Sequence, residues 1–175
     1  VLDIRADGTV TIVEADAVAI ERIESNGAAV DVKAGGDLAI GGAIVVEVGG
    51  VLLQADGAIT LGKAVSTDGG AISIVAGNGL VLGDEADLRS AGGDITLRGG
   101  AGVLTMTDDT YVDAANGSLT LSADGAVTIG KLRSTKVGGT VSITSGGVVD
   151  GGEGETDIIA ATSTLKIVAQ GGIGS

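Results

Sequence analysis

The segment Ala6–Ile12, with the sequence ADGTVTI, contains the pattern on which the fold of this chain depends. A turn that ends in glycine is followed at once by residues that alternate between apolar and polar. The phrase returns as Ala55–Leu61 and Ala123–Ile129, and the next residues are also alike, GKAVST at Gly62–Thr67 and GKLRST at Gly130–Thr135. Alternation with a period of two indicates β-strands, and glycine and aspartate favour tight turns.

A finer repeat lies beneath these phrases, because apolar-x-apolar triplets occur along the whole chain. The outer residues of a triplet point to the same side of a strand. Successive triplets begin 20 to 24 residues apart, about 22 on average, which is the period of one turn of a solenoid. The triplets are Val10/Ile12, Val30/Val32, Val51/Leu53, Ile72/Ile74, Ile95/Leu97, Leu119/Leu121, Val141/Ile143 and Leu165/Ile167.

Two further apolar sites follow each triplet, which predicts three short strands per turn. The second begins seven to nine residues after the first, at Val18, Leu38, Ile59, Leu80, Leu104, Val127, Val148 and Ile173. The third lies near Ile23, Val46, Val65, Leu88, Val112, Leu132 and Ile158. We therefore predict an all-β parallel β-helix of about eight coils, with residues 1–175 as a single unit.

The middle residue of each first triplet is expected to face solvent. Seven of these eight residues are polar, and the row reads Thr11, Asp31, Leu52, Ser73, Thr96, Thr120, Ser142, Lys166. A slip of one residue would exchange this row with the buried one, so the pattern specifies the register strongly.

Composition excludes several classes of function. The chain has a formal net charge of −13, a single aromatic residue, Tyr111, and no His, Trp, Phe, Pro or Cys. Nucleic-acid binding needs a basic surface and usually aromatic stacking, so we predict none. No apolar run approaches the roughly 18 to 20 residues of a membrane span. Carboxylates are plentiful, but no pattern selects an acid pair, and we predict that the protein is not an enzyme.

Several segments resemble the repeats of filamentous-haemagglutinin-type exoproteins and related giant bacterial adhesins. The resemblance rests on GGDITL at Gly92–Leu97, on the recurring ADG phrases, and on GGIG at Gly171–Gly174, and it extends over essentially the whole chain. It implies secretion through a partner transporter, a long right-handed parallel β-helix, and a place outside the cell or on the bacterial surface. The secretion domain of that family carries Asn-Pro-Asn motifs, whereas this chain has no proline, so the resemblance implies a fragment of the shaft.

Three functions are compatible with these observations. The first is a structural shaft that presents a binding tip and supports cell attachment, its partners being neighbouring repeats of the same chain. The second is a module that binds a host or cell-surface protein or glycan, with Tyr111, Asp108, Asp109 and Asp113 as its local candidate site. The third is a polysaccharide-degrading β-helix of the tailspike or lyase kind, which would need a groove and an acid pair.

Acidic residues recur at equivalent positions in several coils, in the loop after the second strand. The groups are Asp84, Glu85 and Asp87; Asp108, Asp109 and Asp113; and Asp150, Glu153, Glu155 and Asp157. Equivalent loops of a solenoid stack on one another, so these carboxylates are expected to share one edge of the rod. Calcium prefers carboxylate and carbonyl oxygens, and the first two groups form a candidate calcium site. The alternative is a solvated edge that Lys131, Arg133 and Lys136 neutralise; no other cofactor is predicted.

Overall fold

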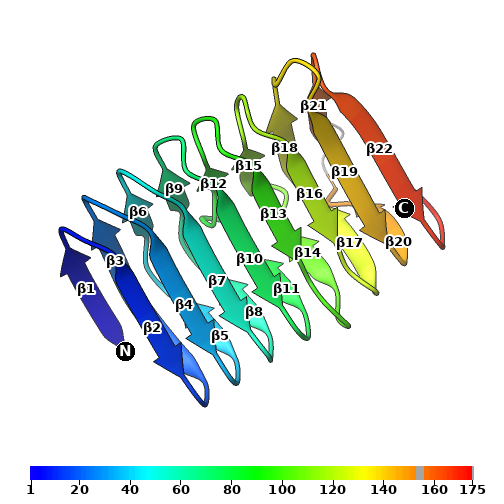
Figure 1. Ribbon diagram of the computed structural model, residues 1–175. Helices are drawn as coiled ribbons and strands as arrows, with labels where there is room; N and C mark the ends of the chain where they lie inside the picture. The colour runs from blue at the N-terminus through cyan, green and yellow to red at the C-terminus, as the bar shows by residue number, and fades with distance from the viewer. Residues whose placement is uncertain (153–155, 175) are drawn as a thin grey trace.

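The computed structural model describes residues 1–152 and 156–174, and it is an all-β solenoid in which the chain winds as a right-handed coil (Figure 1). All strand pairs within its two sheets are parallel. Each coil presents three faces that meet at three corners. We number the corners by the face that precedes them, so the third corner leads into the first face of the next coil. The described residues include no helix, and hence none that could cross a membrane.

The first face is an eight-stranded parallel sheet. The predicted triplets pair in register from coil to coil along its whole length, beginning with Val10 opposite Val30 and ending with Val141 opposite Leu165. The prediction for this face, including its outward row, is therefore confirmed. Its strands are β2 (Val10–Glu14), β4 (Val30–Ala34), β7 (Val51–Ala55), β10 (Ile72–Ala76), β13 (Ile95–Arg98), β16 (Leu119–Ser122), β19 (Thr140–Ser145) and β22 (Thr164–Ala169).

The second face is formed by the strands that follow the first corner. The predicted second sites pair in register here, as Leu38 does with Ile59 and Leu80 with Leu104. The strands are the first part of β3 (Val18–Ser25), β5 (Leu38–Ile40), β8 (Ile59–Leu61), β11 (Leu80–Leu82), β14 (Leu104–Met106), β17 (Ala126–Ile129) and β20 (Gly147–Asp150).

The third face completes each coil. Its strands are β1 (Leu2–Ala6), the second part of β3, β6 (Ile44–Val46), β9 (Val65–Thr67), β12 (Leu88–Arg89), β15 (Tyr111–Asp113), β18 (Lys131–Ser134) and β21 (Ile158–Ala160). The second and third faces form one hydrogen-bonded sheet because β3 runs through both. Only Glu21 and Arg22 separate its inward residues Ile20 and Ile23, and with no glycine at this corner the strand bends instead of ending.

One residue of the predicted third site is wrong by two positions. Ile44, and not Val46, pairs with Ile23 on one side and Val65 on the other. Both Ile44 and Val46 are buried. Because inward side chains recur every second residue, hydrophobicity alone does not distinguish them.

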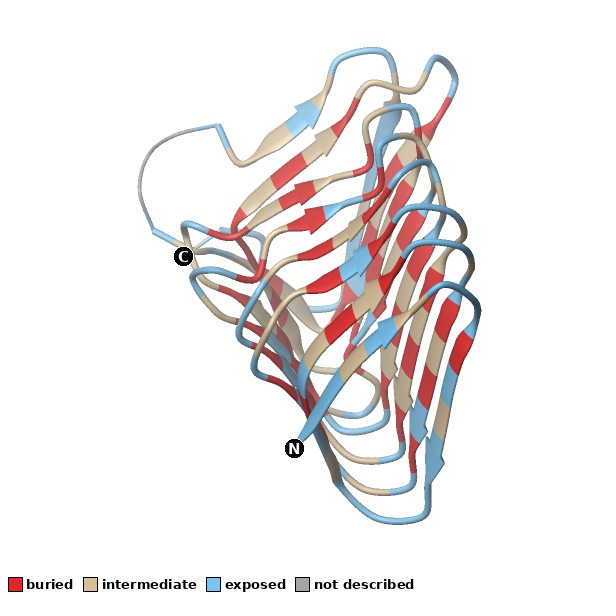
Figure 2. Cartoon of the chain, turned by 90° about the vertical axis from the view of Figure 1, so that its left-hand side faces the viewer, coloured by how far each residue is buried: buried red, intermediate tan, exposed pale blue. Residues whose placement is uncertain are grey.

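The core is a stack of aliphatic columns inside the three faces. In Figure 2 the buried residues alternate with intermediate or exposed ones along the inner strands and line up from coil to coil. Leu53, Ile74 and Leu97, for example, are paired neighbours on the first face and are fully buried. Burying such a side chain stabilises the fold by roughly 1.5–3 kcal/mol, so the columns hold each coil to both of its neighbours.

Buried hydroxyl groups stabilise the third corner, a feature that the apolar pattern did not reveal. Ser25, Thr67, Ser90 and Ser134 are almost completely buried there. The hydroxyl groups of Ser25, Thr67 and Ser90 each donate a hydrogen bond to the carbonyl oxygen three residues later, whereas Ser134 donates to Gly117 in the neighbouring coil. Among the described residues no buried side-chain polar atom is left without a partner. The Ser/Thr-x-x-Gly spacing at Thr67 and Ser90 is the sequence signal of this corner.

Close stacking also restricts the size of corner residues. The Cβ atom of an alanine at Gly70 would overlap the carbonyl oxygen of Gly49 in the coil below. The distance between stacked strands is about 4.8 Å, which leaves no room for a side chain between two superimposed corners. Much of the high glycine content therefore follows from packing.

Replacing Thr67 with valine keeps the side-chain volume but removes the donor to the carbonyl oxygen of Gly70. The lost hydrogen bond should destabilise the protein by about 1–3 kcal/mol, because the buried carbonyl loses its partner. The measurement is the urea midpoint followed by circular dichroism. Thr60→Val is the matched control, since Thr60 is exposed on the second face, and an equal midpoint for both variants would contradict the role assigned to the hydroxyl.

Candidate functional site

The second corner brings the predicted acidic residues together. The loops 83–87 and 107–110 lie one above the other, because β11 pairs with β14 and β12 pairs with β15. The loops contain Asp84, Glu85, Asp87, Asp108 and Asp109, whereas Asp113 lies on β15 and points outward from the third face. Glu153 and Glu155 of the third acidic group lie outside the described residues.

Several of these carboxylates already have partners within the protein. Glu85 forms an ion pair with Lys63 in the preceding coil. Asp87 accepts hydrogen bonds from Arg89 at 3.0 Å and from the backbone N–H of Tyr111 at 3.0 Å. Such contacts use the oxygens that a calcium ion would need.

Asp113 is engaged in the same way, by Arg133 at 2.9 Å and by the backbone N–H of Ala115 at 2.8 Å. Within residues 1–152 and 156–174, no three His, Cys, Asp or Glu side chains are arranged so that they could hold a metal ion. A calcium site at Asp84, Glu85, Asp87, Asp108, Asp109 and Asp113 therefore stays a prediction, and the geometry favours the neutralised edge.

A second group of acidic residues meets across a short corner. Only Gly130 separates β17 from β18, and Gly151, directly after β20, lies against the Asp108 carboxylate two coils earlier. Burial raises the pKa of Asp157, and the negative charges of Asp150 and Asp108, with a side-chain hydrogen bond to Asp150, raise it further; Lys131 acts in the opposite direction. Burial and the neighbouring negative charges therefore favour the protonated form of Asp157 in the folded protein.

The third face carries a charged ladder around Tyr111. Arg89, Asp113 and Arg133 face one another in successive strands, so positive and negative side chains alternate up the column. The guanidinium carbon of Arg89 lies 5.7 Å from the centre of the Tyr111 ring, a cation–π contact. The hydrogen bond from Arg133 to Asp113 also raises the pKa of the arginine.

This ladder differs from the site expected around Tyr111. The sequence grouped Tyr111 with Asp108, Asp109 and Asp113 and named Arg133 among the cations that neutralise this edge, and Arg133 does pair with Asp113. It did not predict the contact of Arg89 with Tyr111. The spacing in the sequence could have revealed this arrangement. Arg89 lies 24 residues before Asp113 and Arg133 lies 20 residues after it, which is one coil on either side. Arg133 pairs with Asp113, and Arg89 lies over Tyr111, in each case across adjacent strands. The ladder therefore links neighbouring coils, as cross-strand pairs do in other sheets.

Comparisons of the chain with protein-family models, with curated proteins and with solved structures gave no match. The fold alone defines the class, a parallel β-solenoid with aliphatic columns inside and cross-coil ion pairs outside. The resemblance to haemagglutinin-type repeats remains a prediction.

Calcium should not stabilise this protein, because ion pairs already neutralise Glu85, Asp87 and Asp113. We expect the same melting temperature in EDTA and in millimolar calcium, measured by circular dichroism. Magnesium at the same ionic strength is the control for screening. A higher melting temperature in calcium alone would show that the acidic corner does hold the ion.

Replacing Asp157 with asparagine should raise the melting temperature at pH 7. The pKa of Asp157 is raised in the folded protein, so folding favours its protonated form. Its contribution to stability is present below the ordinary value of 3.8 and is lost as the pH rises through the raised pKa. The neutral amide avoids that loss, so the advantage of the variant should shrink toward about pH 4.

Asp109→Asn is the control for Asp157→Asn, because it removes one negative charge from an exposed position at the same corner. Thermal melts of both variants at the two pH values separate the local effect from the net charge. If the two variants behave alike, the raised pKa of Asp157 does not affect stability.

Proposed function

We propose that this protein is a segment of the structural shaft of a large bacterial surface or secreted adhesin, and that its role is mechanical and not catalytic. The observation that supports this most is the continuity of its columns. Inward residues keep one register from coil to coil on every face, as Ile59, Leu80 and Leu104 do on the second. A shaft requires this property, whereas a compact binding domain does not.

Coil-to-coil ion pairs support the same role. Arg5 pairs with Glu24 and Arg22 with Asp3 near one end, and Arg133 pairs with Asp113 further along. Each exposed pair contributes little to stability by itself, but together they resist sliding of one coil over the next. Stability in such an array is close to a sum of nearest-neighbour terms, so the rod is stiff without a large globular core.

The last described coil leaves members of two aliphatic columns exposed. Leu165 and Ile173 continue columns whose earlier members, such as Val141 and Val148, are buried. They are 46% and 63% exposed, and the outer edge of β22 has no strand beside it among the described residues. A further coil in the same register would cover these side chains and pair this edge. An open sheet edge otherwise favours association.

The adhesin and the extracellular location are carried over from the sequence resemblance. The absence of cysteine and the acidic surface are compatible with that environment. In the proposed protein, neighbouring repeats of the same chain cover both ends of the segment, and attachment to a host protein or glycan takes place at the tip.

Removal of one complete coil is a direct test of the shaft role. Deleting residues 51–71 joins Gly50 to Ile72, and because Val51 and Ile72 occupy the same position in adjacent coils, β4 can then pair with β10. We expect a folded, shorter rod, measured by circular dichroism and small-angle scattering. Deleting only residues 51–61 breaks the register and should prevent folding. Equal behaviour of the two deletions would contradict a purely additive array.

The proposed location at the cell surface can be tested separately. Antibodies raised against the purified segment should label intact source cells, and protease treatment of those cells should remove the label. Labelling that appears only after permeabilisation would place the protein inside the cell and overturn the adhesin proposal, whatever the result of the deletions.

A further inference from the structure

Arg98 differs from the other arginines of the chain in having no acidic partner. Arg5, Arg22, Arg89 and Arg133 each form an ion pair with an aspartate or glutamate within 3.0 Å. No hydrogen bond or ion pair joins the Arg98 guanidinium to any residue that the structure describes, and the side chain is exposed at the end of β13. Among the described residues it is therefore the one guanidinium without an ion pair, and it is available to a ligand.

Arg98 lines a pocket at the first corner. The pocket has a volume of about 250 Å³ and is lined by Arg98, Gly100, Ser122, Ala123, Asp124 and Thr144. The corner after β13 is one residue longer than most others, since Leu104 follows Ile95 by nine positions. Gly100 takes a positive φ of 56° and the backbone N–H of Asp124 donates to its carbonyl oxygen at 2.9 Å, so this corner folds back against the next and leaves a hollow beside the sheet.

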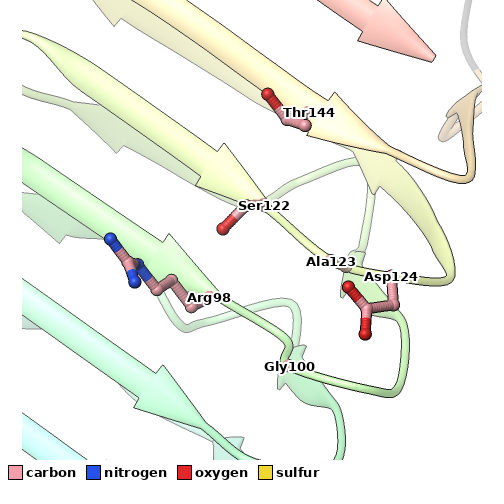
Figure 3. A pocket seen from close by; sticks show the side chains of 6 residues that line it. All are labelled: Arg98, Gly100, Ser122, Ala123, Asp124 and Thr144. Atoms are coloured by element: carbon pink, nitrogen blue, oxygen red, sulfur yellow. The ribbon is translucent and has the colours of Figure 1, made fainter.

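Three side chains of the pocket form one outward column of the first face. Arg98 is opposite Ser122, and Ser122 is opposite Thr144, so their Cα atoms are separated by the strand spacing of about 4.8 Å. In Figure 3 the Arg98 guanidinium and the Asp124 carboxylate lie on opposite sides of the Ser122 hydroxyl group. The Asp124 carboxylate, like the guanidinium, has no partner in the described part of the chain.

The order of these groups determines what the pocket can bind. A guanidinium binds a carboxylate through two parallel hydrogen bonds. An ionised aspartate only accepts hydrogen bonds, whereas a serine or threonine hydroxyl both donates and accepts. A complementary ligand therefore has a carboxylate at one end and hydroxyl donors at the other.

The surface beside the pocket is also rich in hydroxyl groups. The adjacent outward column of the first face contains Ser73, Thr96, Thr120 and Ser142 in register. The pocket volume lies below the 300–1,000 Å³ that is typical for drug-sized ligands, so it suits one sugar ring, and the neighbouring column can contact the next ring of a chain. Both properties favour a saccharide over a small amino acid.

We propose that the pocket formed by Arg98, Ser122, Asp124 and Thr144 binds a saccharide unit that carries a carboxylate, with Arg98 on the carboxylate and Asp124 on the sugar hydroxyl groups. The site is on the side of the solenoid, so it does not depend on the proposed shaft role. It would give this segment a weak affinity for acidic polysaccharides.

The test is a titration of the whole 175-residue chain with D-glucuronate, followed by two-dimensional NMR of its backbone amides. The ionic strength should be about 0.15 M, where the Debye length of about 8 Å screens the distant acidic residues. We expect saturable shifts at Gly100, Ser122 and Asp124 with a dissociation constant of about 1 mM, equivalent to about −4 kcal/mol.

Variants identify the groups responsible. Arg98→Gln and Asp124→Asn should each weaken binding about tenfold, the effect of losing roughly 1.4 kcal/mol. Lys33→Gln is the matched control, because Lys33 occupies the same outward column on an earlier strand, and its replacement removes the same positive charge. Its affinity should equal that of the unaltered protein, and all three variants should keep its urea midpoint.

Glucose and acetate separate the two halves of the ligand. Each should bind at least about tenfold more weakly than D-glucuronate. Acetate binding as tight as that of glucuronate would mean a simple anion site and would overturn the proposal. So would the absence of shifts at about 50 mM glucuronate, which is far above a millimolar dissociation constant, or an unchanged affinity in Arg98→Gln.

Discussion

The parallel backbone ladder between successive coils is the constraint on which the rest of this structure depends. Each strand is hydrogen bonded to its equivalents in the coils before and after it, as β10 is to β7 and β13. Every corner must therefore return the chain to a position about 4.8 Å along the axis. That distance requires glycine where corners overlap, as at Gly70 above Gly49, and it aligns inward side chains into aliphatic columns.

The same ladder determines which polar side chains meet. Outward residues that are about 22 positions apart become neighbours, and the consequence depends on their charges. On the third face Arg89, Asp113 and Arg133 alternate in sign, and Asp113 pairs with Arg133 in the next coil. On the first face Arg98 is followed by Ser122 and Thr144, which carry no charge, so its guanidinium remains available. The same stacking of strands thus produces both ion pairs between coils and a candidate binding pocket.

Sequence similarity along the chain does not always mean equivalence in space. The ADG phrase at Ala6–Ile12 leads into the first face, whereas its copies at Ala55–Leu61 and Ala123–Ile129 lead into the second. The matching segments GKAVST and GKLRST are also offset by one residue, since Val65 and Leu132 occupy one inward column although the letters align Val65 with Arg133. The phrase encodes a turn and a strand, and the hydrophobic columns decide to which face they belong.

The sequence by itself determined the parallel solenoid, its three faces, and the register of the first and second faces, because a period of two within strands and about 22 between them leaves one way to bury the aliphatic residues. It also placed Asp84, Glu85, Asp87, Asp108 and Asp109 at one corner, whereas Asp113 lies on the third face beside it. Only the tertiary structure decided that Ile44 and not Val46 continues the third column, that β3 bends without a break, and which carboxylates have partners. Those outcomes depend on corner lengths and side-chain directions, since one residue more or less at a corner changes which side chains meet while the hydrophobic pattern stays the same.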